Sequence, residues 1–183
     1  MGFRKYVKDY SNEYIIKPNG KPGVIAVYKG KYFRFVADEG RLKKAKIVFA
    51  SLSVLATVLC IIPFLYRSNG SHTMYVSLPH VACLFPILHL LMGVYNLCFR
   101  KPPFVREYKD KTEGRITASS IASACFLGAT AVAQIVNCAI TGFSFPNVIY
   151  FILLLLACAA TGVIFFLRDV LKTEECNAEG TKI

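Results

Sequence analysis

The sequence has almost no charge over more than half of its length. Asp, Glu, Lys and Arg make up 18% of its 183 residues, and 55% of the residues are hydrophobic. An average soluble domain has about a quarter charged residues. Charged side chains are absent from residues 47–66, 68–99 and 116–167. This distribution excludes an ordinary soluble domain and predicts segments buried in a membrane.

The charge-free stretches predict four transmembrane helices, because roughly 20 helical residues cross a bilayer core. We place them at residues 47–66, 75–99, 116–140 and 148–167. The stretch from residue 116 to residue 167 is too long for one span, and Gly142, Pro146 and Asn147 supply a turn within it. The predicted fold class is therefore an all-α membrane protein, a four-helix bundle with short external turns at 67–74 and 141–147.

The positive charges predict the orientation. Of the 22 Lys and Arg residues, 21 lie in residues 1–46, 100–115 and 168–183, which are alternate connections of the four spans. Cytoplasmic segments collect Lys and Arg. We therefore expect both termini and the 100–115 loop in the cytoplasm. The predicted location is a plasma or inner cell membrane.

The formal net charge of +11 has its explanation in the same pattern. Anionic headgroups attract basic residues at the ends of spans by about 1 kcal/mol each. We expect headgroup contacts, rather than nucleic-acid binding, from the clustered residues Arg41, Lys43, Lys44, Lys46, Arg100 and Lys101.

Paired thiols and acidic groups are missing from the predicted spans. Six of the seven cysteines lie in spans, none forms a CxxC pair, and Cys176 lies in the tail. No span contains a carboxylate, the usual titratable group of a proton relay. His80 and Cys83 share a helix face, but a metal site needs three or four ligands. No metal, cofactor or catalytic residue is predicted.

Residues 13–37 have a different composition. Three short runs rich in aromatic and β-branched residues, 13–17, 24–28 and 32–36, are separated by Pro and Gly. Such runs predict a small cytoplasmic antiparallel β-meander. Asp38 is then expected to cap a basic helical turn that leads into the first span.

The other predicted cytoplasmic segments are short. The 100–115 loop begins with Pro102-Pro103, and we expect a short helix after it in which Glu107 pairs with Lys111. The 168–183 tail is expected to be disordered.

A polar stripe runs along the predicted third span. Thr130, Gln134 and Asn137 lie within about 40° of Ser123 on an ideal helix. His89 and Asn96 make a second polar line on the second span. These side chains either hold helices together through hydrogen bonds or line a path for a small polar solute.

These patterns predict a class of protein and not a particular one. The preferred hypothesis is a non-enzymatic integral membrane protein, a scaffold or accessory subunit that contacts lipid and a membrane protein partner or forms a homo-oligomer. The alternative is a small oligomeric transporter or channel that uses the stripe. An intramembrane enzyme would have only His80 and Cys83 as a candidate pair.

Overall fold

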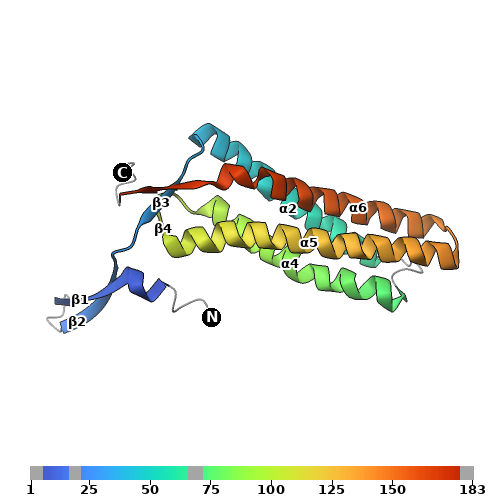
Figure 1. The fold of residues 1–183 in the computed structure, drawn as a ribbon, viewed down its shortest axis with the longest axis horizontal. Helices are drawn as coiled ribbons and strands as arrows, with labels where there is room; N and C mark the ends of the chain where they lie inside the picture. The colour runs from blue at the N-terminus through green and yellow to red at the C-terminus, as the bar shows by residue number, and fades with distance from the viewer. Residues whose placement is uncertain (1–5, 17–21, 66–71, 178–183) are drawn as a thin grey trace.

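Four long helices form the body of the protein (Figure 1). The computed structural model describes residues 6–16, 22–65, 72–177, and the helices are α2 (Glu39–Leu65), α4 (Met74–Phe99), α5 (Arg106–Thr141) and α6 (Phe145–Phe166). Each helix packs against the next one along the chain, and α6 also packs against α2. The result is a closed bundle, and each helix is long and apolar enough to cross a membrane.

The helices cover the predicted spans but extend beyond two of them. α2 begins at Glu39, directly after the predicted cap Asp38, and α5 begins at Arg106. The helix expected after Pro102-Pro103 is therefore present, but it is not short: residues 106–115 are the first turns of α5 and continue into the third predicted span. Residues 106–115 contain no Pro, so no helix breaker of that kind interrupts the helix once it has started. Most of the predicted 67–74 turn lies outside the described residues.

Local capping sets the start of α2. The Asp38 carboxylate accepts a hydrogen bond from the Gly40 N–H at 3.2 Å, and the Asp38 carbonyl accepts one from the Leu42 N–H at 2.8 Å. This confirms the predicted N-cap. The predicted Glu107–Lys111 pair is also present on the first turns of α5.

The bundle has polar groups inside and apolar groups outside. Its buried polar side chains include His80, Gln134 and Asn147, whereas Phe85, Ile140 and other large apolar side chains are exposed on its surface. In water this arrangement would leave a large apolar surface exposed. It suits a surface that faces lipid, because polar side chains of membrane-spanning helices usually face the interior of the bundle.

Two small antiparallel sheets lie at one end of the bundle (Figure 1). The first is a hairpin of β1 (Tyr10–Ile16) and β2 (Pro22–Tyr28), in which Tyr10 is opposite Tyr28 and Tyr14 is opposite Val24. The first two predicted strands are therefore confirmed as a pair, except that Lys17 and the turn lie outside the described residues.

The third predicted strand does not join this hairpin. β3 (Tyr32–Phe35) pairs instead with β4 (Phe104–Val105) on one side and β5 (Thr173–Cys176) on the other. The predicted three-stranded meander was wrong, because the backbone of β3 finds its partners in segments far away along the chain. We refer to β4–β3–β5 as the three-stranded sheet.

The described part of the C-terminal tail is ordered into two elements. The 3₁₀ helix η2 (Leu167–Leu171) continues from α6, and β5 then pairs with β3. The prediction of a disordered tail was wrong for these residues, because Leu171 and Cys176 are buried and Glu174 and Glu175 form ion pairs with Arg34 and Lys31. Residues 178–183 lie outside the described part of the chain.

Candidate functional site

The polar stripe of α5 lies inside the bundle. Ser123, Thr130, Gln134 and Asn137 are all buried, as predicted for one face of this helix. The Thr130 hydroxyl donates to the Phe126 carbonyl of its own helix at 2.8 Å. Cys83 of α4 donates its thiol to the Ser123 carbonyl at 3.7 Å. The stripe therefore lies in the packed interface of α5 with its neighbours.

Gln134 and Asn137 connect α5 to other segments at the end of the bundle opposite the sheets. The Gln134 Nε2 donates to the Asn147 carbonyl of α6 at 3.4 Å. The Asn137 Oδ1 accepts hydrogen bonds from the hydroxyls of Thr73 and Tyr75, at 3.3 and 3.2 Å. These bonds hold the start of α4 and the start of α6 against the last turns of α5.

Some buried polar atoms of this region have no hydrogen-bond partner among the described residues. They include Ser123 Oγ, Gln134 Oε1, Asn137 Nδ2 and both side-chain polar atoms of Asn147. A buried polar group without a partner costs about 1–3 kcal/mol. Such a group is either a cost of packing or a sign that the region takes up a small polar molecule such as water.

The second predicted polar line does not join the stripe. His89 is exposed on the outer face of α4, so the expectation that it faces the bundle interior was wrong. Asn96 is half-buried, and its carbonyl accepts a hydrogen bond from the Tyr108 hydroxyl. On an ideal helix His89 and Asn96 lie on nearly the same face. Of the two, only Asn96 is partly covered by a neighbouring segment.

His80 is bonded at both ring nitrogens. Its Nδ1 lies 2.6 Å from the Tyr150 hydroxyl of α6, and its Nε2 lies 3.0 Å from the Cys60 carbonyl of α2. Tyr150 was not among the predicted site residues, although it is the one tyrosine of the fourth predicted span. Across residues 6–16, 22–65 and 72–177, no group of three His, Cys, Asp or Glu side chains is placed to hold a metal ion. His80 thus joins three helices.

Of the six basic residues expected to contact headgroups, two contact other parts of the protein and the other four are exposed. Lys46 lies 3.4 Å from the Cys98 carbonyl and 3.5 Å from the Arg100 carbonyl, so its ammonium group meets the C-terminal end of α4, where a cation is favoured. The Arg100 guanidinium lies 4.9 Å from the centre of the Tyr108 ring. Arg41, Lys43, Lys44 and Lys101 are exposed.

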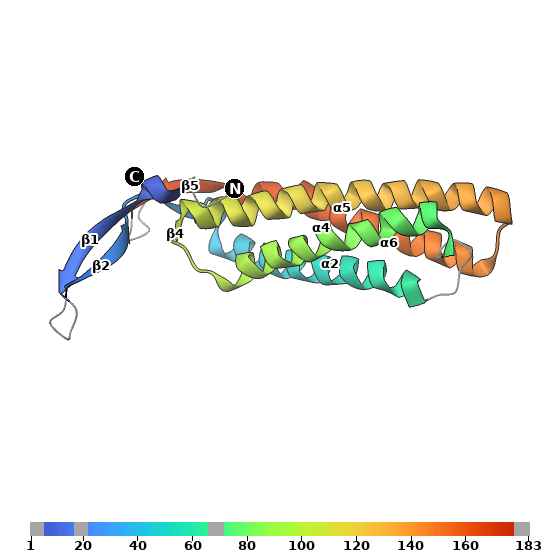
Figure 2. The same cartoon turned by 90° about the horizontal axis from the view of Figure 1, so that it is seen from below.

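In the described part of the chain, hydrogen bonds attach the base of the hairpin to its surroundings. The Tyr28 hydroxyl accepts a hydrogen bond from the Arg106 N–H at 3.1 Å and donates one to the Lys31 carbonyl at 2.8 Å. Burial raises the pKa of Tyr28, so this hydroxyl stays protonated near neutral pH. The Tyr6 hydroxyl also donates to Asp110 at 3.1 Å. From this base the hairpin extends away from the helices (Figure 2).

One face of the hairpin is apolar and open. Alternate residues of a strand share a face, so Tyr10, Tyr14 and Ile16 lie together with Val24 of the paired strand. The Tyr14 and Ile16 side chains are 84% and 80% exposed. At the base of the same face, a groove of about 470 Å³ is lined by residues of the hairpin, of its approach and of α5: Tyr6, Val7, Tyr10, Asn12, Ala26 and Glu107.

Comparison with known proteins does not assign this chain to a family, since no family model, curated protein or solved structure matches it.

Proposed function

We propose that this protein is a non-enzymatic integral membrane protein that serves as an interaction subunit, in which the bundle is the membrane anchor and the hairpin binds a partner protein. The open apolar face of the hairpin is the observation that carries the proposal. Large exposed apolar patches are typical of interaction surfaces. Tyrosine on such a face supplies a large contact area at low entropic cost.

The placement of the hairpin favours a protein partner over the bilayer. The hairpin lies beyond the three-stranded sheet, at the end of the long axis of the molecule (Figure 2). In a bundle that crosses the membrane along its axis, this point is remote from the lipid. By the distribution of Lys and Arg, the hairpin and both termini are in the cytoplasm. A plasma or inner membrane is the location we propose.

Site-specific crosslinking tests this proposal. A photo-reactive amino acid at Tyr14 is expected to give one discrete adduct in native membranes. The same amino acid at Ile25, which is also exposed but lies on the opposite face of the hairpin, is the matched control. The control should give little or no adduct. Mass spectrometry of the adduct distinguishes another membrane protein from a second copy of this chain.

The charge substitution Ile16→Lys should abolish the Tyr14 adduct, whereas Ile25→Lys should leave it intact. Adducts of equal yield from the two faces, or no adduct from either face, would contradict a docking role for the hairpin.

A second candidate function, passage of a small polar solute, is favoured by the unpaired polar atoms of Gln134, Asn137 and Asn147. The test is osmotic swelling of proteoliposomes in glycerol or urea. If the stripe lines a path, Gln134→Ala changes the rate of swelling, whereas His89→Ala on the outer face does not. Rates equal to those of protein-free liposomes contradict this alternative.

A further inference from the structure

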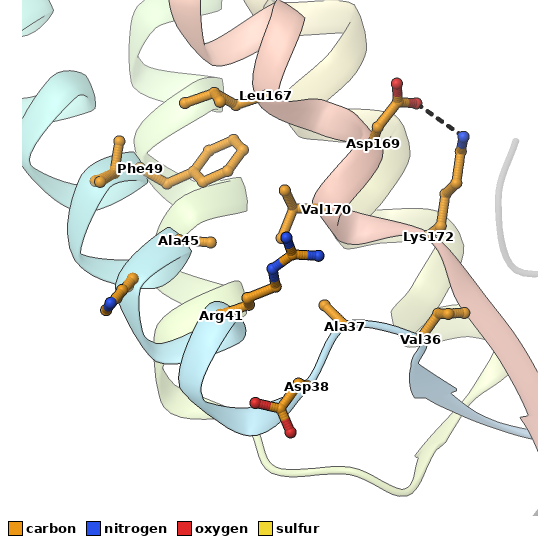
Figure 3. Close-up of a pocket in the computed structure, with 12 residues that line it drawn as sticks. Val36, Ala37, Asp38, Arg41, Ala45, Phe49, Leu167, Asp169, Val170 and Lys172 are labelled. Carbon is orange, nitrogen blue, oxygen red and sulfur yellow. Dashed lines mark ion pairs between the residues drawn. The ribbon is translucent and has the colours of Figure 1, made fainter.

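A cavity lies where α2 meets the end of α6. It has a volume of about 670 Å³ and is bounded by the first turns of α2, the segment that precedes α2, and η2 (Figure 3). The wall formed by η2 is fixed to the end of β3, because the Val36 N–H donates to the Lys172 carbonyl at 3.0 Å. The cavity is therefore built from parts of the chain that the three-stranded sheet brings together.

One part of the cavity is apolar. Phe49 is fully buried at its floor, and Ala45, Val48, Leu167 and Val170 line it as well. Ala45 and Phe49 follow Arg41 at intervals of four residues, so these three residues lie on one face of α2. The apolar floor thus begins directly below the first basic residue of the helix.

The rim of the cavity is basic. Arg41 extends from α2 toward Val170, and the carboxylate of Asp38 points away from the Arg41 guanidinium (Figure 3). Asp169 of the rim is paired with Lys172 at 3.1 Å. Among the residues that the structure describes, neither Arg41 nor Lys44 has an acidic partner in an ion pair. Two cations therefore remain available to an anion.

The depth of the cavity suits a lipid. Arg41 and Phe49 are eight residues apart, which corresponds to about 12 Å along a helix. The polar region on each side of a bilayer core is about 5–8 Å thick. An anionic group held at Arg41 would therefore be followed, within the length of this cavity, by the start of the acyl region at Phe49.

We propose that this cavity binds one anionic phospholipid, with the phosphate between Arg41 and Lys44 and the upper part of an acyl chain on Ala45, Val48 and Leu167, at the level of the buried Phe49. The site rests on the membrane placement of the bundle but not on the docking role of the hairpin. It differs from general attraction of headgroups, because of the three exposed basic residues Arg41, Lys43 and Lys44 at the start of α2 only Arg41 and Lys44 line the cavity with the apolar floor. Lys43 lies between them in the sequence but does not line it.

Native mass spectrometry of the full chain tests the site. The protein is released from nanodiscs that contain equal amounts of phosphatidylglycerol and phosphatidylcholine. One phosphatidylglycerol is expected to remain bound. Arg41→Gln and Lys44→Gln should each weaken its retention by about fivefold, as expected for the loss of one basic contact at an anionic surface. Lys43→Gln is the matched control, since it removes the same charge from the same helix, and it should leave retention unchanged.

A separate variant tests the apolar part of the cavity. Ala45→Leu fills the cavity without changing charge and should lower retention as well, with the helical circular dichroism and elution volume of the folded protein retained. A competition arm separates lipid from free anion: short-chain phosphatidylglycerol should displace the bound lipid, whereas inorganic phosphate at the same concentration should not.

Three results would overturn the proposal. They are equal retention of phosphatidylcholine, an equal loss in Lys43→Gln, and displacement by inorganic phosphate as effective as displacement by the lipid. Reporter fusions that put the N-terminus outside the cell would contradict the proposed topology but leave this binding result unchanged, so the two failures are distinguishable.

Discussion

The two small sheets differ in how much of their apolar surface is buried. The hairpin β1–β2 is made of segments adjacent in sequence, and its Tyr14 and Ile16 side chains are 84% and 80% exposed. The three-stranded sheet joins segments from the N-terminal region, the α4–α5 connection and the C-terminal tail, and its Phe33 and Phe104 side chains are only 7% and 5% exposed.

This difference indicates a division of roles. Phe33, Phe104 and Tyr108 form a small core that closes one end of the bundle, with Lys109 4.5 Å above the Phe33 ring. Among the described residues, β1 and β2 contribute no side chain to that core. A two-stranded hairpin without a packed face is only marginally stable in water. We infer that the three-stranded sheet serves stability and that the hairpin serves recognition.

The largest effect is expected from breaking the core of the three-stranded sheet. Phe104→Ala removes a buried ring that lies 5.0 Å from the Phe35 ring centre and 5.5 Å from that of Tyr108. Truncation of a buried Phe costs about 3 kcal/mol or more. We expect a lower unfolding midpoint in detergent and faster amide exchange in β3 and β5. An unchanged midpoint would show that the sheet contributes no stability.

A smaller effect is expected at the junction between the three-stranded sheet and the bundle. Asp38→Ala removes the cap of α2, for which a loss of about 1 kcal/mol is typical. Thermal unfolding followed by circular dichroism measures it. Asp38→Ser is the matched control, since a serine hydroxyl also caps and should restore most of the loss. Equal losses in the two variants would exclude capping as the cause.

The ion pair between Arg34 and Glu174 on the three-stranded sheet should contribute less to stability than the Asp38 cap. Arg34 bonds to Glu174 Oε1 through Nε and through a terminal nitrogen, each at 2.8 Å, but both side chains are partly exposed. Such a pair is worth about 0.5 kcal/mol. A double-mutant cycle with Arg34→Ala and Glu174→Ala should give a coupling of that size. A coupling of zero would assign the whole contribution of β5 to its backbone and apolar contacts.

The smallest effect on stability is expected at the tip of the hairpin. Tyr14→Lys should change the free energy of unfolding by less than about 0.5 kcal/mol, because surface substitutions without buried contacts rarely do more. The neighbouring substitution Ile16→Lys should be as small in its effect on stability and should remove the crosslink formed by a photo-reactive amino acid at Tyr14. Chemical denaturation of the purified protein measures the first quantity. A loss as large as that of Phe104→Ala would mean that the hairpin is part of the folded core.

The sequence was informative where structure is local. Charge-free runs located the helices, Asp38 and the Glu107–Lys111 pair were identified from short spacings, and the runs before Tyr28 indicated the hairpin. Each of these features depends on residues of one continuous stretch of the sequence. The membrane crossing and its orientation remain predictions based on hydropathy and charge.

Sequence reasoning failed where the partners are distant. The strand at residues 32–35 pairs with residues 104–105 and 173–176, and no local signal identifies those partners. The short β5 contains two glutamates and looked like a polar tail. Its acidic residues are matched by Arg34 and Lys31, which lie about 140 residues earlier.

The candidate sites show the same limit. Helical periodicity put the stripe of Ser123, Thr130, Gln134 and Asn137 on one buried face, as the structure has it. It also put His89 inside, although a single helix cannot show which of its faces meets its neighbours. The cavity at Arg41 requires α2 and η2 together, so charge alone indicated a basic patch and not its apolar floor.

Hydrogen exchange tests the division of roles most directly. The central claim is that the three-stranded sheet is a stable part of the fold and that the marginally stable hairpin is stabilised further by a partner. In the purified protein, amides of β3 and β5 should be protected while those of β1 and β2 exchange rapidly. In the crosslinked complex from native membranes, the hairpin amides should become protected and those of the sheet should not change. Equal protection of both sheets in the purified protein, or a hairpin that stays unprotected in the complex, would contradict the claim.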